Sequence, residues 1–138
     1  MIFIPSHLWE RLVTNSKAPD GTDHVPVVKF FDPAGAATWL VTEVMDDQDS
    51  LFGLCDLGMG CPELGYVSLT ELKETKNRLG IHLERDLFFS ARYPLSAYAE
   101  AARFAGRITE DETALGDAAR KLGLPDPPKA NPASIPTT

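Results

Sequence analysis

The sequence predicts an α+β fold: an antiparallel sheet of four to five strands with an N-terminal helix, a helix after the central hairpin, and C-terminal helices packed on one face. Strand-like runs between residues 25 and 67 are joined by connections too short for parallel crossovers, which favours antiparallel pairing. Runs with helical periodicity lie on both sides of them. A length of 138 residues fits one domain with a substantial core.

The first helix is predicted over residues 5–16, with Ser6 as its N-cap. Its apolar side chains recur at helical spacing on one face: Leu8, Trp9, Leu12 and Val13. Residues 17–24 contain proline, aspartate and glycine, which are typical of a turn. The helix is therefore expected to end before this segment.

Four strands are predicted over residues 25–31, 37–45, 51–57 and 63–67, where β-branched and aromatic residues are frequent. Strict alternation in the second strand places two sets of side chains on opposite faces. One set is Trp39, Val41, Glu43 and Met45, and the other is Leu40, Thr42 and Val44. In the third strand the sets are Phe52, Leu54 and Asp56, and Leu51, Cys55 and Leu57.

The next helix has a clear start, because Ser68 and Glu71 form an S-x-x-E capping box. Gly80 is expected at its C-terminal end. Residues 81–89 alternate apolar and polar side chains and predict a fifth strand.

Two helices are predicted near the C-terminus, over residues 95–106 and 109–123. The second begins with another capping box, formed by Thr109 and Glu112. Residues 1–123 are thus expected to form a single α+β domain, and the proline-rich residues 124–138 a disordered tail.

The composition limits the classes of function. A net charge of -7 argues against nucleic-acid binding, which needs clustered lysine and arginine, and is compatible with a basic protein partner. The first residues lack the basic and apolar regions of a secretory signal, and no apolar run is long enough to span a membrane. We therefore expect a cytoplasmic protein whose two cysteines are reduced.

Four segments, in this order, carry a resemblance to a known family: HVPVVKFF, ATWLVTEV, FGLCDLGMGCPELGYVSL and PLSAYAEAA. The chain up to about Ala102 resembles the bacterial domain-of-unknown-function family 2958. The resemblance implies an accessory role on plasmids or integrative elements, beside conjugation and anti-restriction genes. It implies no activity and no mechanism.

The run from Gly53 to Leu69 contains four glycines, two acids and both cysteines. Its spacing matches neither a P-loop nor a dinucleotide fingerprint, and positive φ angles in a turn explain the glycines. Cys55 and Cys61 lie across this turn, so a disulfide between them is geometrically conceivable. In a reducing compartment we expect two thiols instead.

One interpretation of the acidic residues is a catalytic site. Neighbouring strands can bring Asp56, Glu63, Glu43 and His24 together at one end of the sheet. Such a cluster holds Mg²⁺ or Mn²⁺, and Lys29 could stabilise a developing anion, as in a metal-dependent hydrolase or nuclease. The alternative is structural: Asp56 accepts hydrogen bonds in the turn, and Glu63 pairs with a cation.

The preferred prediction is a non-enzymatic accessory protein that binds a protein partner, with a host defence component as one candidate. It requires neither a metal nor a cofactor, no nucleic acid and no membrane. The residues expected at its binding surface are Asp56, Glu63, Tyr66, His24 and Lys29. The alternative is the small hydrolase described above.

Overall fold

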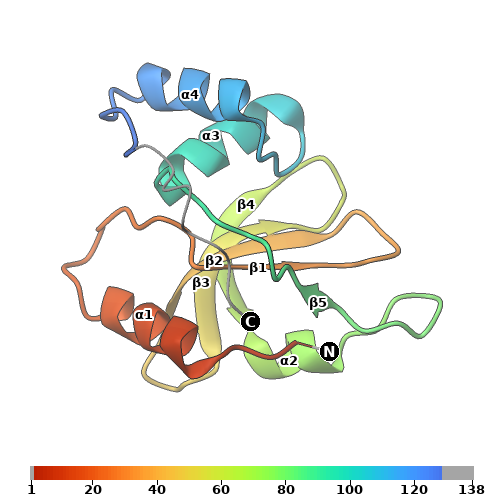
Figure 1. The fold of residues 1–138 in the computed structure, drawn as a ribbon. Coiled ribbons are helices and arrows are strands. Elements are labelled where there is room, and N and C mark those ends of the chain that lie inside the picture. Colours follow the sequence, from red (N-terminus) through yellow and green to blue (C-terminus); the bar gives the residue numbers. More distant parts are fainter. Residues whose placement is uncertain (1, 129–138) are drawn as a thin grey trace.

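The computed structural model describes residues 2–128, in which a five-stranded sheet lies between two layers of helices (Figure 1). The strand order is β4-β3-β2-β1-β5, and every neighbouring pair is antiparallel. The strands are β1 (Val28–Phe31), β2 (Thr38–Val44), β3 (Ser50–Asp56), β4 (Glu63–Ser68) and β5 (Glu84–Arg85). This arrangement confirms the predicted α+β fold.

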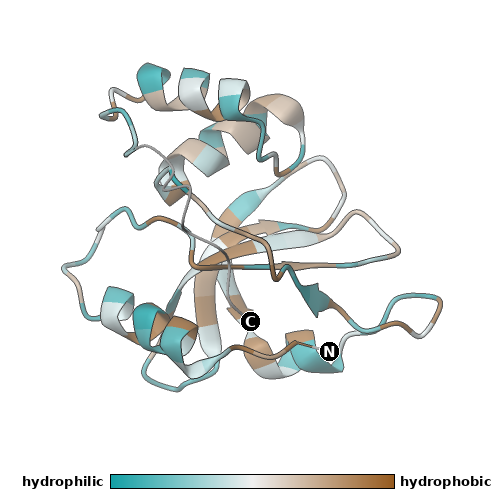
Figure 2. Ribbon diagram, in the orientation of Figure 1, coloured by the Kyte–Doolittle hydropathy of each residue, from teal (hydrophilic) through white to brown (hydrophobic). Residues whose placement is uncertain are grey.

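The helices cover opposite faces of the sheet. They are α1 (Ser6–Ser16), α2 (Leu69–Glu74), α3 (Leu95–Ala105) and α4 (Glu112–Lys121). In the view of Figure 1, α1 and α2 lie below the sheet and α3 and α4 above it. Figure 2 shows hydrophobic residues concentrated on the strands, while the outer parts of α1 and α4 carry hydrophilic ones.

Each helical layer closes its own hydrophobic core. On one face, Leu12 of α1 and Leu72 of α2 pack with Phe30, Val41 and Leu51 of the sheet. On the other face, Leu40 and Leu54 pack against α3 and α4. The helix residues buried there include three alanines of α3 and two of α4: Ala97, Ala101, Ala102, Ala118 and Ala119. These small side chains let the two helices approach each other closely.

A bulge interrupts the alternation of β2. The pairing with β3 shifts between Val41, which lies opposite Gly53, and Glu43, which lies opposite Phe52. Thr42 is the additional residue; it is buried and its hydroxyl donates to the Phe52 carbonyl at 3.3 Å. The predicted faces are therefore wrong beyond Thr42, because a bulge reverses the side on which the later side chains lie.

As a result, Val44 joins the same core as Val41, and Glu43 lies on the face of the sheet that carries α3. The faces predicted for β3 are correct for the four of its residues that pack in the two cores. Leu51 and Cys55 pack in the α1 core, and Phe52 and Leu54 in the α3 core.

Gly53 and Gly65 lie opposite each other on β3 and β4. A Cβ atom on Gly53 would lie 2.0 Å from the Leu40 carbonyl oxygen, whereas a Cβ atom on Gly65 would meet nothing within 4 Å. The bulge thus brings the backbones of β2 and β3 so close that only glycine fits at residue 53.

Three helix termini differ from the predicted ones. Ser6 is the first residue of α1 and not its N-cap; the N-cap is Pro5, and no side chain caps this helix. Ser68 caps α2 as predicted, accepting from the Glu71 amide at 3.2 Å, but α2 ends at Glu74 and not at Gly80. The Asn77 side chain accepts from the amides of Leu79 and Ile81 and organises a separate turn there.

At α4 the N-cap is Asp111, which accepts from the Ala114 amide, so the capping box predicted at Thr109 is wrong by two residues.

The fifth strand is much shorter than the predicted range of residues 81–89. Only Glu84 and Arg85 pair with β1, and the Asp86 side chain then accepts from the Phe88 amide in a turn. Most of the predicted tail, residues 129–138, lies outside the described residues.

Glu100 joins the two helices of the α3 layer. Its carboxylate accepts from Lys121 of α4 at 2.8 Å and from Arg103 at 2.7 Å. The hydrogen bond from Lys121, together with the charges of Lys121 and Arg103, holds the pKa of Glu100 below its ordinary value of 4.5. This carboxylate therefore stabilises the fold only while it is ionised.

We expect Glu100→Gln to lower the Tm at pH 7, because the amide loses the ionic partners. A carboxyl group whose pKa is lower in the folded than in the unfolded protein adds stability at pH values above its unfolded-state pKa. This stability is lost as the pH falls through its folded-state pKa. The difference in Tm between wild type and variant should therefore shrink below about pH 4.5. Thermal unfolding at a series of pH values measures it. Asp117→Asn is the control, since within residues 2–128 Asp117 pairs only with exposed Arg120. Equal effects of both variants at all pH values would contradict the prediction.

Candidate functional site

The residues predicted to form a site lie in four separate places. Asp56 is buried between the sheet and the α3 layer, and Lys29 lies on β1. His24, Glu43 and Tyr66 line one hollow beside the N-terminus of α3. Glu63 lines a neighbouring hollow farther along α3.

Asp56 connects two loops that are distant in the sequence. Its Oδ1 accepts from the Gly58 amide at 2.8 Å, and its Oδ2 accepts from the Ile108 amide at 2.9 Å. Gly58 and Gly60 have φ angles of 80° and 85°, so these two glycines serve the turn as predicted, whereas Gly53 and Gly65 lie within β3 and β4 without a positive φ. With 2% of its surface exposed, Asp56 ties the β3–β4 turn to the α3–α4 connection and is closed to a substrate.

The two cysteines do not form a disulfide. Cys55 is half-buried against the α1 core, and burial raises the pKa of its thiol. A thiol with a raised pKa holds little thiolate at neutral pH and is a poor nucleophile. Cys61 is exposed in the β3–β4 loop.

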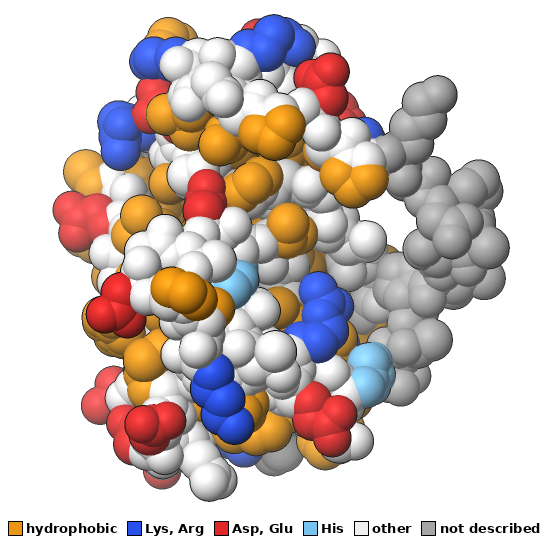
Figure 3. Space-filling model, turned by 90° about the vertical axis from the view of Figure 1, so that its left-hand side faces the viewer, with side chains coloured by type: hydrophobic (Ala, Val, Ile, Leu, Met, Phe, Trp, Pro, Cys, Tyr) orange, Lys and Arg blue, Asp and Glu red, His pale blue; other side chains and the backbone are white. Residues whose placement is uncertain are grey.

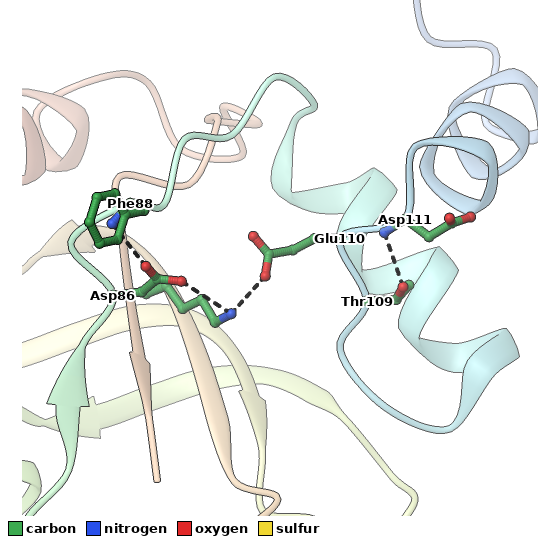
Figure 4. Close-up of polar contacts among 6 residues, drawn as sticks. Asp86, Phe88, Thr109, Glu110 and Asp111 are labelled. Atoms are coloured by element: carbon green, nitrogen blue, oxygen red, sulfur yellow. Dashed lines mark hydrogen bonds and ion pairs between the residues drawn. The ribbon is translucent and has the colours of Figure 1, made fainter. Parts of the chain in front are cut away.

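Lys29 forms a second tie between the sheet and the α3 layer. Its ammonium lies 2.6 Å from Glu110 and 3.5 Å from Asp86, and Figure 4 shows these two carboxylates on either side of it. Nearby, burial and the charge of Glu110 raise the pKa of Tyr98 to about 12. The ammonium group of Lys29 therefore forms ion pairs with both Glu110 and Asp86.

The hollow beside α3 has a volume of about 660 Å³. Its floor is formed by side chains of β2, β3 and β4: Thr42, Glu43, Phe52, Leu64 and Tyr66. One wall is the loop 18–24, and the other is the start of α3 at Leu95 and Ser96. The Asp23 carboxylate accepts from the amide and hydroxyl of Ser96, and His24 contacts the Asn15 carbonyl at 3.1 Å, so both walls are fixed.

A second hollow of about 450 Å³ continues along α3 and shares Leu64 with the first. Its lining comes from β3, the β3–β4 loop, the start of β4 and α3: Leu54, Gly60, Cys61, Pro62, Glu63, Leu64, Ala99 and Arg103. We call the two hollows together the β4 groove. It follows α3 from Ser96 to Arg103, above the outer part of the sheet.

The groove exists because the α3 layer packs over β3 and leaves the side chains of β4 largely uncovered. α3 contacts β3, and α4 packs on α3. Leu64 therefore remains 50% exposed and Tyr66 68% exposed, with the Tyr66 ring centroid 5.1 Å from that of Phe52. Figure 3 shows hydrophobic side chains at the surface across the middle of this side, between the α3–α4 layer above and α1 below.

The groove is predominantly acidic. Four acidic residues line it, Asp20, Asp23, Glu43 and Glu63, and Arg103 is the single lysine or arginine among its lining residues. Glu63 begins β4 and pairs with Cys55, so it lies at the rim of the groove. Glu43 and Glu63 form no ion pair with the described residues. This lining favours a ligand with positive charge and apolar side chains.

The predicted hydrolase cluster does not come together. Asp56 is buried in its tie, Glu63 lies in the outer hollow, and only Glu43 and His24 share the inner one. Among residues 2–128, no three side chains of histidine, cysteine, aspartate or glutamate are placed to hold a metal ion. No helix in that part of the chain is long and apolar enough to cross a membrane.

Sequence reasoning identified Tyr66 but missed Phe52 and Leu64 as its neighbours on the groove floor. A signal was present, because Leu64 and Tyr66 alternate along β4 and pair with Leu54 and Phe52 of β3. The alternation along β4 does not show that α3 leaves this edge of the sheet uncovered.

The comparisons with known proteins agree with the resemblance noted in the sequence. No curated protein and no solved structure matches the chain. The model of one family, described as "Protein of unknown function (DUF2958)", matches residues 3–109. This segment includes the whole sheet, α1, α2 and α3, and it ends before α4. The chain therefore belongs to the DUF2958 family.

Proposed function

We propose that this protein is a non-enzymatic accessory protein of a bacterial mobile element, and that it acts in the cytoplasm by binding a protein partner in the β4 groove. The observation that carries the proposal is the uncovered face of β4. Leu64 and Tyr66 expose apolar surface there, beside four acidic residues.

The groove has the features of a protein interface. An exposed tyrosine on a rigid strand is a typical anchor of binding energy, and an apolar centre with a charged surround is typical of interfaces. Tyr66 and Leu64 provide the centre, while Glu43 and Glu63 provide the surround.

The charge of the protein indicates the kind of partner. A net charge of -7 and an acidic groove attract a basic protein and increase its rate of association. A basic component of host defence would fit both this charge and the mobile-element role that the family resemblance implies. The hydrolase alternative gains no support, since Asp56, Glu63 and His24 lie apart.

The test is affinity capture from a bacterial host lysate, followed by titration of the purified captured protein. We expect the double variant Leu64→Ser, Tyr66→Ser to bind about tenfold or more weakly than wild type, because two anchors are lost. Phe88→Ser is the matched control, since Phe88 is 81% exposed but lies beyond β5, away from the groove.

Equal binding by wild type and the double variant would rule out the β4 groove as the binding surface. Equal loss in both variants would show that general surface hydrophobicity, and not this groove, retains the captured protein. Circular dichroism confirms beforehand that each variant is folded.

A further inference from the structure

We propose that the occupant of the β4 groove is an extended, positively charged segment of the partner, which pairs with the outer edge of β4 as a sixth strand. This inference rests on the proposed function, because it specifies how the partner binds. It follows from the backbone of β4, the difference between the two sheet edges, and the charge of the groove.

The outer edge of β4 presents backbone groups that no strand in the described chain pairs with. The Leu69 amide donates to the Asp49 carbonyl, and the Phe52 carbonyl accepts from Thr42 on the opposite side of β3. In an antiparallel ladder, alternate residues point their N–H and C=O groups toward the same neighbour. By this alternation, Gly65 directs its backbone groups toward β3, whereas Leu64 and Tyr66 direct theirs outward.

The two edges of the sheet differ in how they are protected against strand addition. β5 is only two residues long, and the side chain of Arg85, its second residue, donates to the Phe3 carbonyl. β4 has six residues and pairs with β3 in regular register, without a bulge, a proline or a lysine. Short strands, bulges, prolines and lysines are the usual means of blocking an edge, so β4 is open to pairing.

The same residues that offer backbone groups also offer apolar side chains. Leu64 and Tyr66 lie on the groove face of β4, so alternate side chains of an added strand would pack beside them. On the opposite face, the space around Gly65 is open. Backbone pairing and side-chain packing are therefore available to one extended segment at once.

Charge indicates a basic segment and argues against a second copy of this chain. Glu63 begins β4, and Glu43 lies in one row across the sheet with Phe52 and Tyr66. Pairing two copies through β4 would bring together two chains that each carry a net charge of -7. A segment rich in lysine or arginine would be attracted instead, and this attraction weakens with added salt.

The first experiment uses defined ten-residue peptides. The probe alternates lysine and valine, and two controls replace lysine by glutamate or methylate every backbone nitrogen, so that pairing is blocked whichever set of side chains faces the groove. We expect saturable binding of the lysine peptide, at least tenfold tighter than either control and weaker at high salt. Hydrogen exchange of the Leu64 and Tyr66 amides should slow on binding. Absence of saturable binding, or equal binding of the glutamate or methylated peptide, would overturn strand addition.

The second experiment compares Tyr66→Pro with Tyr66→Thr in full-length protein. Both variants lose the ring, but only proline also removes the outward N–H, and it leaves the ladder to β3 intact. We expect at least a further fivefold loss of affinity for the lysine peptide and for the captured partner in Tyr66→Pro. Equal affinities would overturn the pairing, provided that circular dichroism shows both variants folded.

The outcomes separate this inference from the proposed function. If Leu64→Ser, Tyr66→Ser abolishes capture while Tyr66→Pro and Tyr66→Thr capture equally, the groove binds a partner but β4 does not pair with it. If the double variant captures normally, the proposed function itself fails. Sedimentation that shows a dimer of the wild type, lost in Tyr66→Pro, would assign the edge to a second copy and overturn the inference.

Discussion

Replacing Gly53 by alanine is expected to lower the free energy of unfolding by about 3 kcal/mol, a large effect for one methyl group. The added Cβ atom would lie 2.0 Å from the Leu40 carbonyl oxygen and 2.9 Å from the Val41 Cα atom. Both neighbours are backbone atoms of β2, which cannot rotate away as a side chain can. The strands would have to separate at the bulge, and Leu40 and Val41 belong to the two different cores.

Gly65 provides a matched control for this prediction. It lies directly opposite Gly53, in a strand, and a Cβ atom there meets nothing within 4 Å. Gly65→Ala should therefore be neutral or stabilise by up to about 0.5 kcal/mol, because alanine restricts the unfolded chain. Urea denaturation of both variants measures the difference, and equal midpoints for the two would contradict the clash at Gly53.

Asp56→Ala is expected to destabilise the protein by about 3 kcal/mol, through a different mechanism. The substitution leaves the Gly58 and Ile108 amides without their acceptor, and each amide left unsatisfied on burial costs about 1–3 kcal/mol. Asp56→Asn should be less harmful, because one oxygen remains to accept while the amide nitrogen faces a donor.

Glu63→Ala is the control for the Asp56 variants. Glu63 is exposed seven positions farther along the chain and forms no ion pair with the described residues, so we expect a change within about 0.5 kcal/mol. Denaturant titration of the three variants distinguishes the two roles. A loss in Asp56→Ala no greater than that in Glu63→Ala would show that the tie between the loops adds nothing to stability.

The sequence predicted the fold where local signals and packing agree. Ser68 begins a helix because its hydroxyl accepts from the amide three residues later, which is a local arrangement. The bulge at Thr42 was missed because apolar residues fill both faces of β2, so either alternation satisfies the pattern. The end of α2 was missed because the Asn77 side chain competes locally for backbone amides.

The site was less predictable, because it depends on contacts between distant segments. Asp56 reads as a turn residue, but its second partner, Ile108, lies 52 positions away. The groove depends on how far α3 and α4 extend across the sheet. The residues of β4 do not indicate whether these helices cover it. Tyr66 was a candidate in the sequence, but the exposed face it occupies is a result of packing.

The division of the interior into two cores has a consequence for how the molecule opens. α3 and α4 form one contiguous helical hairpin, held to the sheet by the second core and by the ties at Asp56 and Lys29. Such a hairpin is a candidate unit of sub-global unfolding, which can detach while the α1 core stays ordered. Detachment would uncover Leu40 and Leu54 next to the face of β4 that is already bare. In such a detached form, the exposed apolar surface of β4 would extend across the sheet to β2.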